Sequence, residues 1–495
     1  MAATTPTPTT AFAPPSILAD IEADMSPEAG ALFTDLVAGW FAETRRGEGP
    51  VSTPRSAAEL APRFAEPMPL DGRPLEEVVA RVARDVLPDC NRLWHPMYAG
   101  HQVSAALPAA EWAESLVGAL NQSLAVWEMS PTITVLETQL VRWCCELVGW
   151  GAGAGGTFTS GGTEATFAAL LAARARALPD AWRDGMGTSA PLVLCGEHAH
   201  YAVARAVGEM GLGLRNLVVV PSRDWRMDVG ALAAALDAAE RDGRTVLAVV
   251  ATAGSTATGS FDDLEAIGAL CEARGAWLHV DGAHGASALL SDAHAPRLRG
   301  LHRARSIAWD PHKMMLLPLS AGMVLVRDER ELEAAFAQKA PYLFHAGDDE
   351  RVWDQGVRSF QCSRRADALK AWIALQRHGR RGIAALYEHL CATTAELHAM
   401  LAAHPRFAPL HAPESNILCF RWTGDASTPP RDEAALDAVN QHVRAAFNRS
   451  GTGWITATTL GGRRVLRVTV MNPRTRGEHL RRMVDALDAT ALAVA

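Results

Sequence analysis

The sequence predicts an α/β protein in which a mostly parallel central sheet carries helices on both faces. Short apolar runs alternate with helical patterns of about ten to fifteen residues through the middle of the chain, and this alternation is typical of parallel sheets. The 495 residues also exceed what one compact core accommodates, so the chain should divide into two or three parts. We expect a helical N-terminal segment before the sheet and a small α+β C-terminal domain after it.

The N-terminal part of the chain predicts two segments. Residues 1–16 are rich in Thr, Pro and Ala and lack both a basic start and an apolar run, which indicates a disordered leader rather than a signal peptide. Residues 17–90 show helical patterns that break at 47–50 and 67–69, so we expect a helical N-terminal segment there.

The large domain is predicted over residues 91–380. Residues 109–149 have a helical pattern, and a Gly-rich turn then opens another helix over 164–178. The strands expected after it are 192–195, 218–220, 246–251, 277–280, 307–309 and 323–326, with helices such as 229–241 and 264–274 between them. Because ligands of such sheets bind beyond the carboxyl ends of the strands, the loops after these strands should form the site.

The end of the chain predicts the small domain. A helical stretch over 366–401 leads out of the large domain. Residues 381–495 then contain two strand-like runs, 416–422 and 464–471, among helices, which indicates an α+β arrangement.

Composition limits the classes of function. A net charge of −8 and a pI near 6.1 argue against nucleic-acid binding, and the chain contains no apolar run long enough for a membrane span. The eight cysteines are scattered and form no C-x-x-C, so neither a metal site nor a disulfide framework is predicted. A reducing, cytoplasmic location follows as an expectation.

Three features in a fixed chain order predict a cofactor. A turn with Gly161, Gly162 and Thr163 opens a helix, Asp281 ends a predicted strand, and Lys313 follows another strand. Pyridoxal phosphate (PLP) requires this set: backbone amides at a helix N-terminus bind its phosphate, a carboxylate partners its ring nitrogen, and a Lys forms the Schiff base. We therefore expect PLP as cofactor, with Asp281 and Lys313 as catalytic residues.

Five motifs give the chain a family resemblance over about residues 95–473. They are Thr-Ser-Gly-Gly-Thr-Glu-Ala, Glu-His-Ala-His-Tyr, His-Val-Asp-Gly-Ala-His-Gly, Asp-Pro-His-Lys and Cys-Ser-Arg-Arg-Ala-Asp-Ala-Leu-Lys. With them the chain resembles the group II PLP-dependent amino-acid decarboxylases, which include the glutamate, aspartate, aromatic-L-amino-acid and diaminobutyrate decarboxylases. The resemblance implies the fold-type-I, PLP-dependent transferase-like architecture and decarboxylation of an L-amino acid.

The resemblance also implies roles for further residues. His200 matches the catalytic histidine that stacks on the cofactor ring, and the Tyr after it sets the register there rather than on His198. Ala283 would lie under the ring, Thr252 matches a polar residue near the cofactor, and His312 matches the residue that reaches the phosphate.

The sequence departs from the family pattern at two places. Gly282 and His284 stand where the family often has Ala and an aromatic residue. The loop at 341–356 has no Tyr at the place where the family carries the one that protonates the α-carbon; Tyr342 stands only at its root. Either His345 or another group donates that proton, or the product is an aldehyde instead of an amine.

The substrate end of the site is predicted from four residues. His101, Gln102 and Ser104 lie in the segment that matches the family's substrate-facing loop, and they are polar where aromatic decarboxylases are apolar. Arg467, a charge inside an apolar strand, matches the arginine that holds the substrate's α-carboxylate region. Polar pockets discriminate strongly, because an apolar substrate leaves their groups unpaired.

The prediction is therefore decarboxylation of a small polar or acidic L-amino acid, with aspartate or glutamate first. A 2,4-diaminobutyrate or aromatic decarboxylase, or an aldehyde synthase, is the alternative; an aminotransferase of the same fold and an inactive binding protein rank behind these. The resemblance also implies a symmetric homodimer, because fold-type-I sites are built at a dimer interface.

Overall fold

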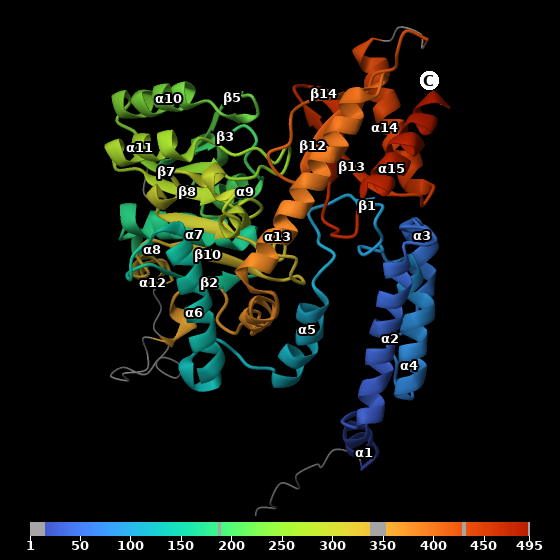
Figure 1. The fold of residues 1–495 in the computed structure, drawn as a ribbon. Helices are drawn as coiled ribbons and strands as arrows, with labels where there is room; N and C mark the ends of the chain where they lie inside the picture. The colour runs from blue at the N-terminus through green and yellow to red at the C-terminus, as the bar shows by residue number, and fades with distance from the viewer. Residues whose placement is uncertain (1–14, 187–189, 337–352, 428–431, 494–495) are drawn as a thin grey trace, which may run out of the picture.

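The computed structural model describes residues 15–186, 190–336, 353–427 and 432–493. Its centre is a seven-stranded sheet in the order β2-β10-β9-β8-β7-β3-β4 (Figure 1). Five neighbours, β9 to β4, run parallel, and β10 is antiparallel to both β9 and β2. The strands are β2 (Gly155–Thr159), β3 (Leu192–Gly196), β4 (Leu217–Val220), β7 (Val246–Thr252), β8 (Trp277–Asp281), β9 (Ser306–Trp309) and β10 (Gly322–Val326). The mostly parallel sheet is confirmed.

Helices cover both faces of this sheet, as predicted. Alternate residues of each strand enter two different cores: on β3, Leu192 and Leu194 face one and Val193 and Cys195 the other. One core includes α6 (Pro131–Val148), α10 (Val229–Arg241), α11 (Leu264–Arg274) and α13 (Ala368–Ala403). The other includes α7 (Gly162–Ala177), α9 (Ala202–Glu209) and α12 (Arg330–Ala335).

Two parts of the large domain differ from the expectation. The single helical region at 109–149 is two helices, α5 (Pro108–Leu120) and α6, because Asn121 ends the first in a left-handed conformation and Pro131 starts the second. The strand β2 was not predicted. Its sequence, Gly-Gly-Thr-Phe-Thr, begins with two Gly residues, which disfavour a strand, and lacks the Val, Ile and Leu residues by which the other strands were found.

The small domain is built on a five-stranded sheet in the order β1-β13-β14-β12-β11. The predicted strands correspond to β12 (Ile417–Trp422) and β14 (Arg463–Thr469), whereas β11 (Phe407–Pro409) and β13 (Trp454–Leu460) were missed. The fifth strand of this sheet, β1 (Tyr98–Ala99), comes from the N-terminal part of the sequence and pairs in parallel with β13. The helices α14 (Glu433–Arg449) and α15 (Gly477–Leu492) complete the α+β arrangement.

The long helix α13 connects the two domains. It is interrupted at Gly379, whose φ of 66° and ψ of 168° are not helical. Gly379 permits this break, because only Gly adopts such a conformation without strain. The predicted boundary between residues 380 and 381 lies next to it.

The N-terminal helices lie beside the small domain, apart from the seven-stranded sheet (Figure 1). They are α1 (Pro15–Asp24), α2 (Pro27–Arg46), α3 (Ala57–Leu60) and α4 (Leu75–Asp85). The proposed leader lies outside the described residues apart from Pro15 and Ser16, which open α1. Within the described ranges, we find no helix that is both long and apolar enough to cross a membrane.

Candidate active site

A cavity of about 320 Å³ lies at the carboxyl ends of the parallel strands. Its wall brings together every residue predicted to bind the cofactor, from segments up to 150 residues apart: Gly161, Gly162, Thr163, His200, Thr252, Asp281, Ala283, His312 and Lys313. Ser160, Gly254, Thr256, His284, Asp310 and Leu319 complete the lining. The position agrees with the rule that ligands of parallel sheets bind where the strands end.

The Gly-rich turn connects β2 to the N-terminus of α7. A Cβ atom on Gly162 would lie 2.7 Å from the Ala283 Cβ and 3.1 Å from Asp310 Oδ2, so only Gly fits. Glu164 stabilises the turn, because its Oε2 accepts hydrogen bonds from the backbone N of Ser160 at 2.9 Å and from its Oγ at 2.7 Å. The positive end of α7 therefore faces the cavity, which favours an anionic ligand such as a phosphate.

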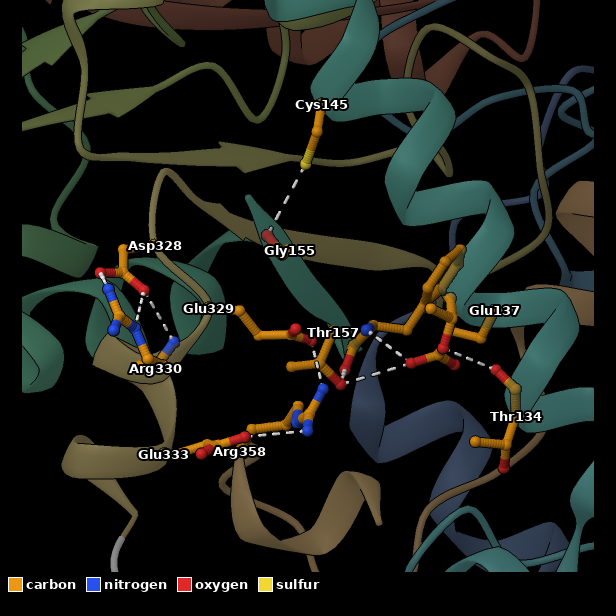
Figure 2. Close-up of polar contacts among 12 residues, drawn as sticks. Thr134, Glu137, Cys145, Gly155, Thr157, Asp328, Glu329, Arg330, Glu333 and Arg358 are labelled. Carbon is orange, nitrogen blue, oxygen red and sulfur yellow. Dashed lines mark hydrogen bonds and ion pairs between the residues drawn. The ribbon is translucent and has the colours of Figure 1, made fainter. Parts of the chain in front are cut away.

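A buried ion pair supports β2 just before this turn, and Figure 2 shows its carboxylate partner, Glu137, beside Thr157 of this strand. Glu137 of α6 accepts from Arg364 at 2.8 and 2.6 Å, and from the backbone N of Phe158 at 3.1 Å. β2 is the edge strand of the sheet, so the Glu137 carboxylate occupies the backbone donor of Phe158 that no neighbouring strand reaches. Arg364 belongs to one of the five motifs named above, but no role was predicted for this residue.

Asp281 ends β8 beside Thr252, its register partner on β7. Its Oδ1 accepts from the backbone N of Ala283 at 3.2 Å, and burial raises the pKa of the carboxyl while the charge of Lys313 opposes that shift. The Thr252 Oγ1 is buried and has no hydrogen-bond partner within the described part of the chain. A ligand with a protonated ring nitrogen would offset the cost of charging Asp281, and its polar substituents would satisfy Thr252.

Lys313 and His312 approach the cavity from the turn after β9. Lys313 Nζ lies 3.0 Å from Asp310 Oδ2. The Nδ1 atom of His312 accepts from the backbone N of Ala321 at 3.0 Å, so in the neutral ring Nε2 carries the hydrogen, 3.5 Å from Asp310 Oδ2. Asp310 was missed as a site residue, although its i, i+3 spacing from Lys313 would have indicated an ion pair.

The two candidate histidines separate as predicted. His200 lines the cavity, its Nδ1 accepts from the backbone N of Ala202 at 3.2 Å, and burial lowers its pKa. His198 lies outside the cavity lining, with Nε2 3.1 Å from the Ser222 Oγ.

The predicted substrate residues are outside the cavity lining but next to it. Arg467 of β14 is buried; its Nε donates to the Ala257 carbonyl at 3.3 Å and its Nη1 to Thr456 Oγ1 at 3.2 Å. The remaining nitrogen, Nη2, has no partner among the described residues. Ala257 follows Thr256, which lines the cavity, so the guanidinium lies close behind the wall.

The other three lie on the segment after β1. His101 is an exposed residue, and its pKa is lowered by partial desolvation of its ring and by the charge of Arg467. Gln102 Nε2 is buried without a partner among described residues. The buried Ser104 Oγ lies 3.2 Å from the His312 carbonyl and 3.3 Å from the Leu317 carbonyl, which places it in support of the Lys313 segment. Contact of these three residues with substrate stays a prediction.

The cavity fits PLP: it combines a glycine cradle at a helix N-terminus, a buried carboxylate, a free Thr hydroxyl and an amine. In the described part of the chain, no three His, Cys, Asp or Glu side chains are grouped so that they could hold a metal ion. Fold and site together define a PLP-dependent enzyme of fold type I.

Comparison with known proteins identifies the family. Residues 58–423 match the pyridoxal-dependent decarboxylase conserved domain. The L-2,4-diaminobutyrate decarboxylase of Rhizobium meliloti (strain 1021) is 35% identical over 435 residues, which are 86% of this chain and 84% of that protein. The L-aspartate decarboxylase dtxS4 of Metarhizium robertsii is 30% identical over 413 residues, 83% of this chain and 81% of that protein. The crystal structure of mouse CSAD matches with a TM-score of 0.87 at 27% identity, over 94% of this chain and 99% of that one. The chain belongs to the pyridoxal-dependent decarboxylase family and is a PLP-dependent amino-acid decarboxylase.

Proposed function

We propose that the enzyme removes CO2 from a small polar L-amino acid. The observation that carries this proposal is the buried Arg467 guanidinium, which has only a carbonyl and a hydroxyl as described partners and one unpaired nitrogen. An uncompensated buried cation is costly, and a bound carboxylate would compensate it. Every amino acid supplies that group as its α-carboxylate.

The chain's own residues divide the work around the substrate. When bound, PLP supplies the sink for the electrons that remain when CO2 departs. Asp281 would keep the ring nitrogen of the cofactor protonated, His200 would lie against its ring, and the Lys313 amine would hold the cofactor until a substrate amine takes its place. Arg467 orients the α-carboxylate.

Two kinds of side chain suit a polar pocket. An acidic one, aspartate or glutamate, is favoured by the cations beside the cavity and is named in the Metarhizium relative. An amino side chain, as in 2,4-diaminobutyrate, is favoured by the Rhizobium relative, at 35% identity. Aromatic amino acids rank behind both, since the charge of Arg467 reaches the polar His101 ring and the buried Nε2 of Gln102 has no partner among the described residues.

The test is a panel of L-amino acids that scores CO2, amine and aldehyde separately. Aspartate, glutamate and 2,4-diaminobutyrate should outpace tyrosine, tryptophan and DOPA, and Arg467→Met should raise KM for all of them about 100-fold or more. Preference for an aromatic substrate would contradict the pocket assignment. Scoring aldehyde also tests the open question of the loop at 341–356, since residues 337–352, with Tyr342 and His345, lie outside the described ranges.

We also propose a symmetric homodimer. Exposed apolar side chains line α1, α2, the turn between these two helices, and α5: Ile17, Leu18, Ile21, Met25, Phe33, Val37, Trp112, Leu116 and Leu120. An apolar surface of this extent is typical of obligate interfaces. Sedimentation should give a dimer, and an active monomer would contradict it. A cytoplasmic location stays a prediction, supported by eight free cysteines.

A further inference from the structure

His284 is a buried polar residue of the cavity wall for which the reaction described so far has no use. It follows Asp281 by three residues, lines the cavity, and is only 3% exposed. Lys313 lines the same cavity, and the charges of Lys313 and Arg467 both act on the His284 ring, so the ring lies near both of these cations. A side chain in the wall of this cavity is placed to contact a molecule that binds there.

The small domain fixes which nitrogen of His284 carries the hydrogen. Nε2 lies 2.7 Å from Asn416 Oδ1. The other atom of that amide, Nδ2, donates to the Val470 carbonyl at 2.9 Å, so the orientation of the Asn416 amide is set and Oδ1 must accept. His284 therefore donates through Nε2, and in the neutral ring Nδ1 carries only a lone pair.

That lone pair has no partner among the described residues, and Nδ1 is buried. The ring stays neutral, because burial, more than the nearby cations, lowers its pKa to about 3. A residue of the cavity wall thus carries one hydrogen-bond acceptor that no described residue satisfies, and a buried acceptor without a donor is unfavourable by itself.

We propose that His284 determines substrate specificity by accepting, at Nδ1, a hydrogen bond from an N–H or O–H group on the substrate side chain. The inference rests on the proposed function and narrows it to side chains that end in a donor. An amino or hydroxyl group satisfies the acceptor. A side-chain carboxylate brings a second acceptor against the lone pair, and a methyl group leaves the lone pair unpaired.

The first experiment compares four substrates of the holoenzyme: L-2,4-diaminobutyrate, L-homoserine, L-aspartate and L-norvaline. Norvaline has the shape of diaminobutyrate with a methyl group in place of the amine, so it isolates the hydrogen bond. His284→Phe keeps a planar ring and removes the acceptor. We expect kcat/KM for the donor-bearing substrates to fall about 10- to 100-fold relative to norvaline. Comparing amine with hydroxyl shows which donor is bound.

The second experiment reverses the polarity of the same atom. In Asn416→Asp a carboxylate faces Nε2 and favours the doubly protonated ring, so Nδ1 becomes a donor. The ratio of diaminobutyrate to aspartate turnover should then shift towards aspartate by about tenfold or more. Binding of the same four amino acids, followed by the cofactor's visible absorbance, gives a readout independent of turnover, and circular dichroism checks folding.

The outcomes separate cleanly. Loss of the donor preference in His284→Phe together with its reversal in Asn416→Asp supports the role of His284. An unchanged ratio of donor-bearing substrates to norvaline in a folded, PLP-loaded His284→Phe overturns it while leaving decarboxylation intact. Release of CO2 from no polar amino acid overturns the proposed function, and the inference fails with it.

Discussion

Removing Arg364 should destabilise the enzyme far more than removing its neighbour Arg365. Arg364 donates to both oxygens of Glu137, and the two side chains are 3% and 1% exposed. Arg364→Met leaves a buried carboxylate whose described partners are then Thr157 and the Phe158 amide, and breaking a buried pair in this way costs about 3–5 kcal/mol. The Arg365 side chain is 53% exposed in its pair with Glu114, so Arg365→Met should cost at most about 1 kcal/mol.

The assay is urea unfolding of the two variants as apoproteins, followed by titration with PLP. Arg364→Met should also bind PLP more weakly, because β2 delivers the Gly-rich turn. The double variant Glu137→Met/Arg364→Met should be more stable than Arg364→Met alone, since it leaves no charge buried. Equal unfolding midpoints for Arg364→Met and Arg365→Met would refute the argument.

Three further predictions concern the cofactor and pH. Lys313→Ala should abolish the visible absorbance band that appears when PLP is added to the parent, and a parent protein that stays colourless would remove the basis for the site. Asp281→Asn should retain the cofactor but lose turnover by orders of magnitude, measured as kcat, because an amide does not hold the ring nitrogen protonated; near-normal turnover would show that another group does so. Burial lowers the pKa of His279 to about 3, against about 6.5 when unfolded, so the unfolded chain binds more protons below pH 6.5 and stability falls as the pH drops from about 6.5 towards 3. Between pH 7 and 5.5 this removes about 1 kcal/mol, and His279→Gln should lose that share of the pH dependence in urea unfolding.

The strands and helices found from sequence are those whose pattern is local. α10 and α11 were predicted residue for residue, because Asp228 and Asp263 cap their first turns by accepting from backbone amides. β1 and β2 were missed for different reasons: β1 is only two residues long, and β2 is rich in Gly. Their conformation depends on partners distant in sequence, β13 and β10, rather than on their own residues.

The residues of the candidate site also fall into those that a local pattern predicts and those that it does not. The cofactor residues could be predicted because each belongs to a short motif with its own chemistry. The contact between His284 and Asn416 joins residues 132 positions apart in different domains, and nothing near either residue indicates the other. The ion pair between Arg364 and Glu137 likewise joins residues 227 positions apart, one just before α13 and the other on α6.

Because β1 pairs with β13, the predicted substrate residues and the cofactor residues are held by two different sheets. The segment that leads to His101 is hydrogen-bonded into the same small sheet as Arg467, whereas Lys313, Asp281 and the Gly-rich turn belong to the large sheet. We therefore expect replacements within the small sheet to change which amino acid is accepted while the cofactor residues stay intact. To obtain a new substrate, β1 and the β13–β14 hairpin would be exchanged together. The hydrogen bond between Asn416 and His284, which links the two sheets, would be kept.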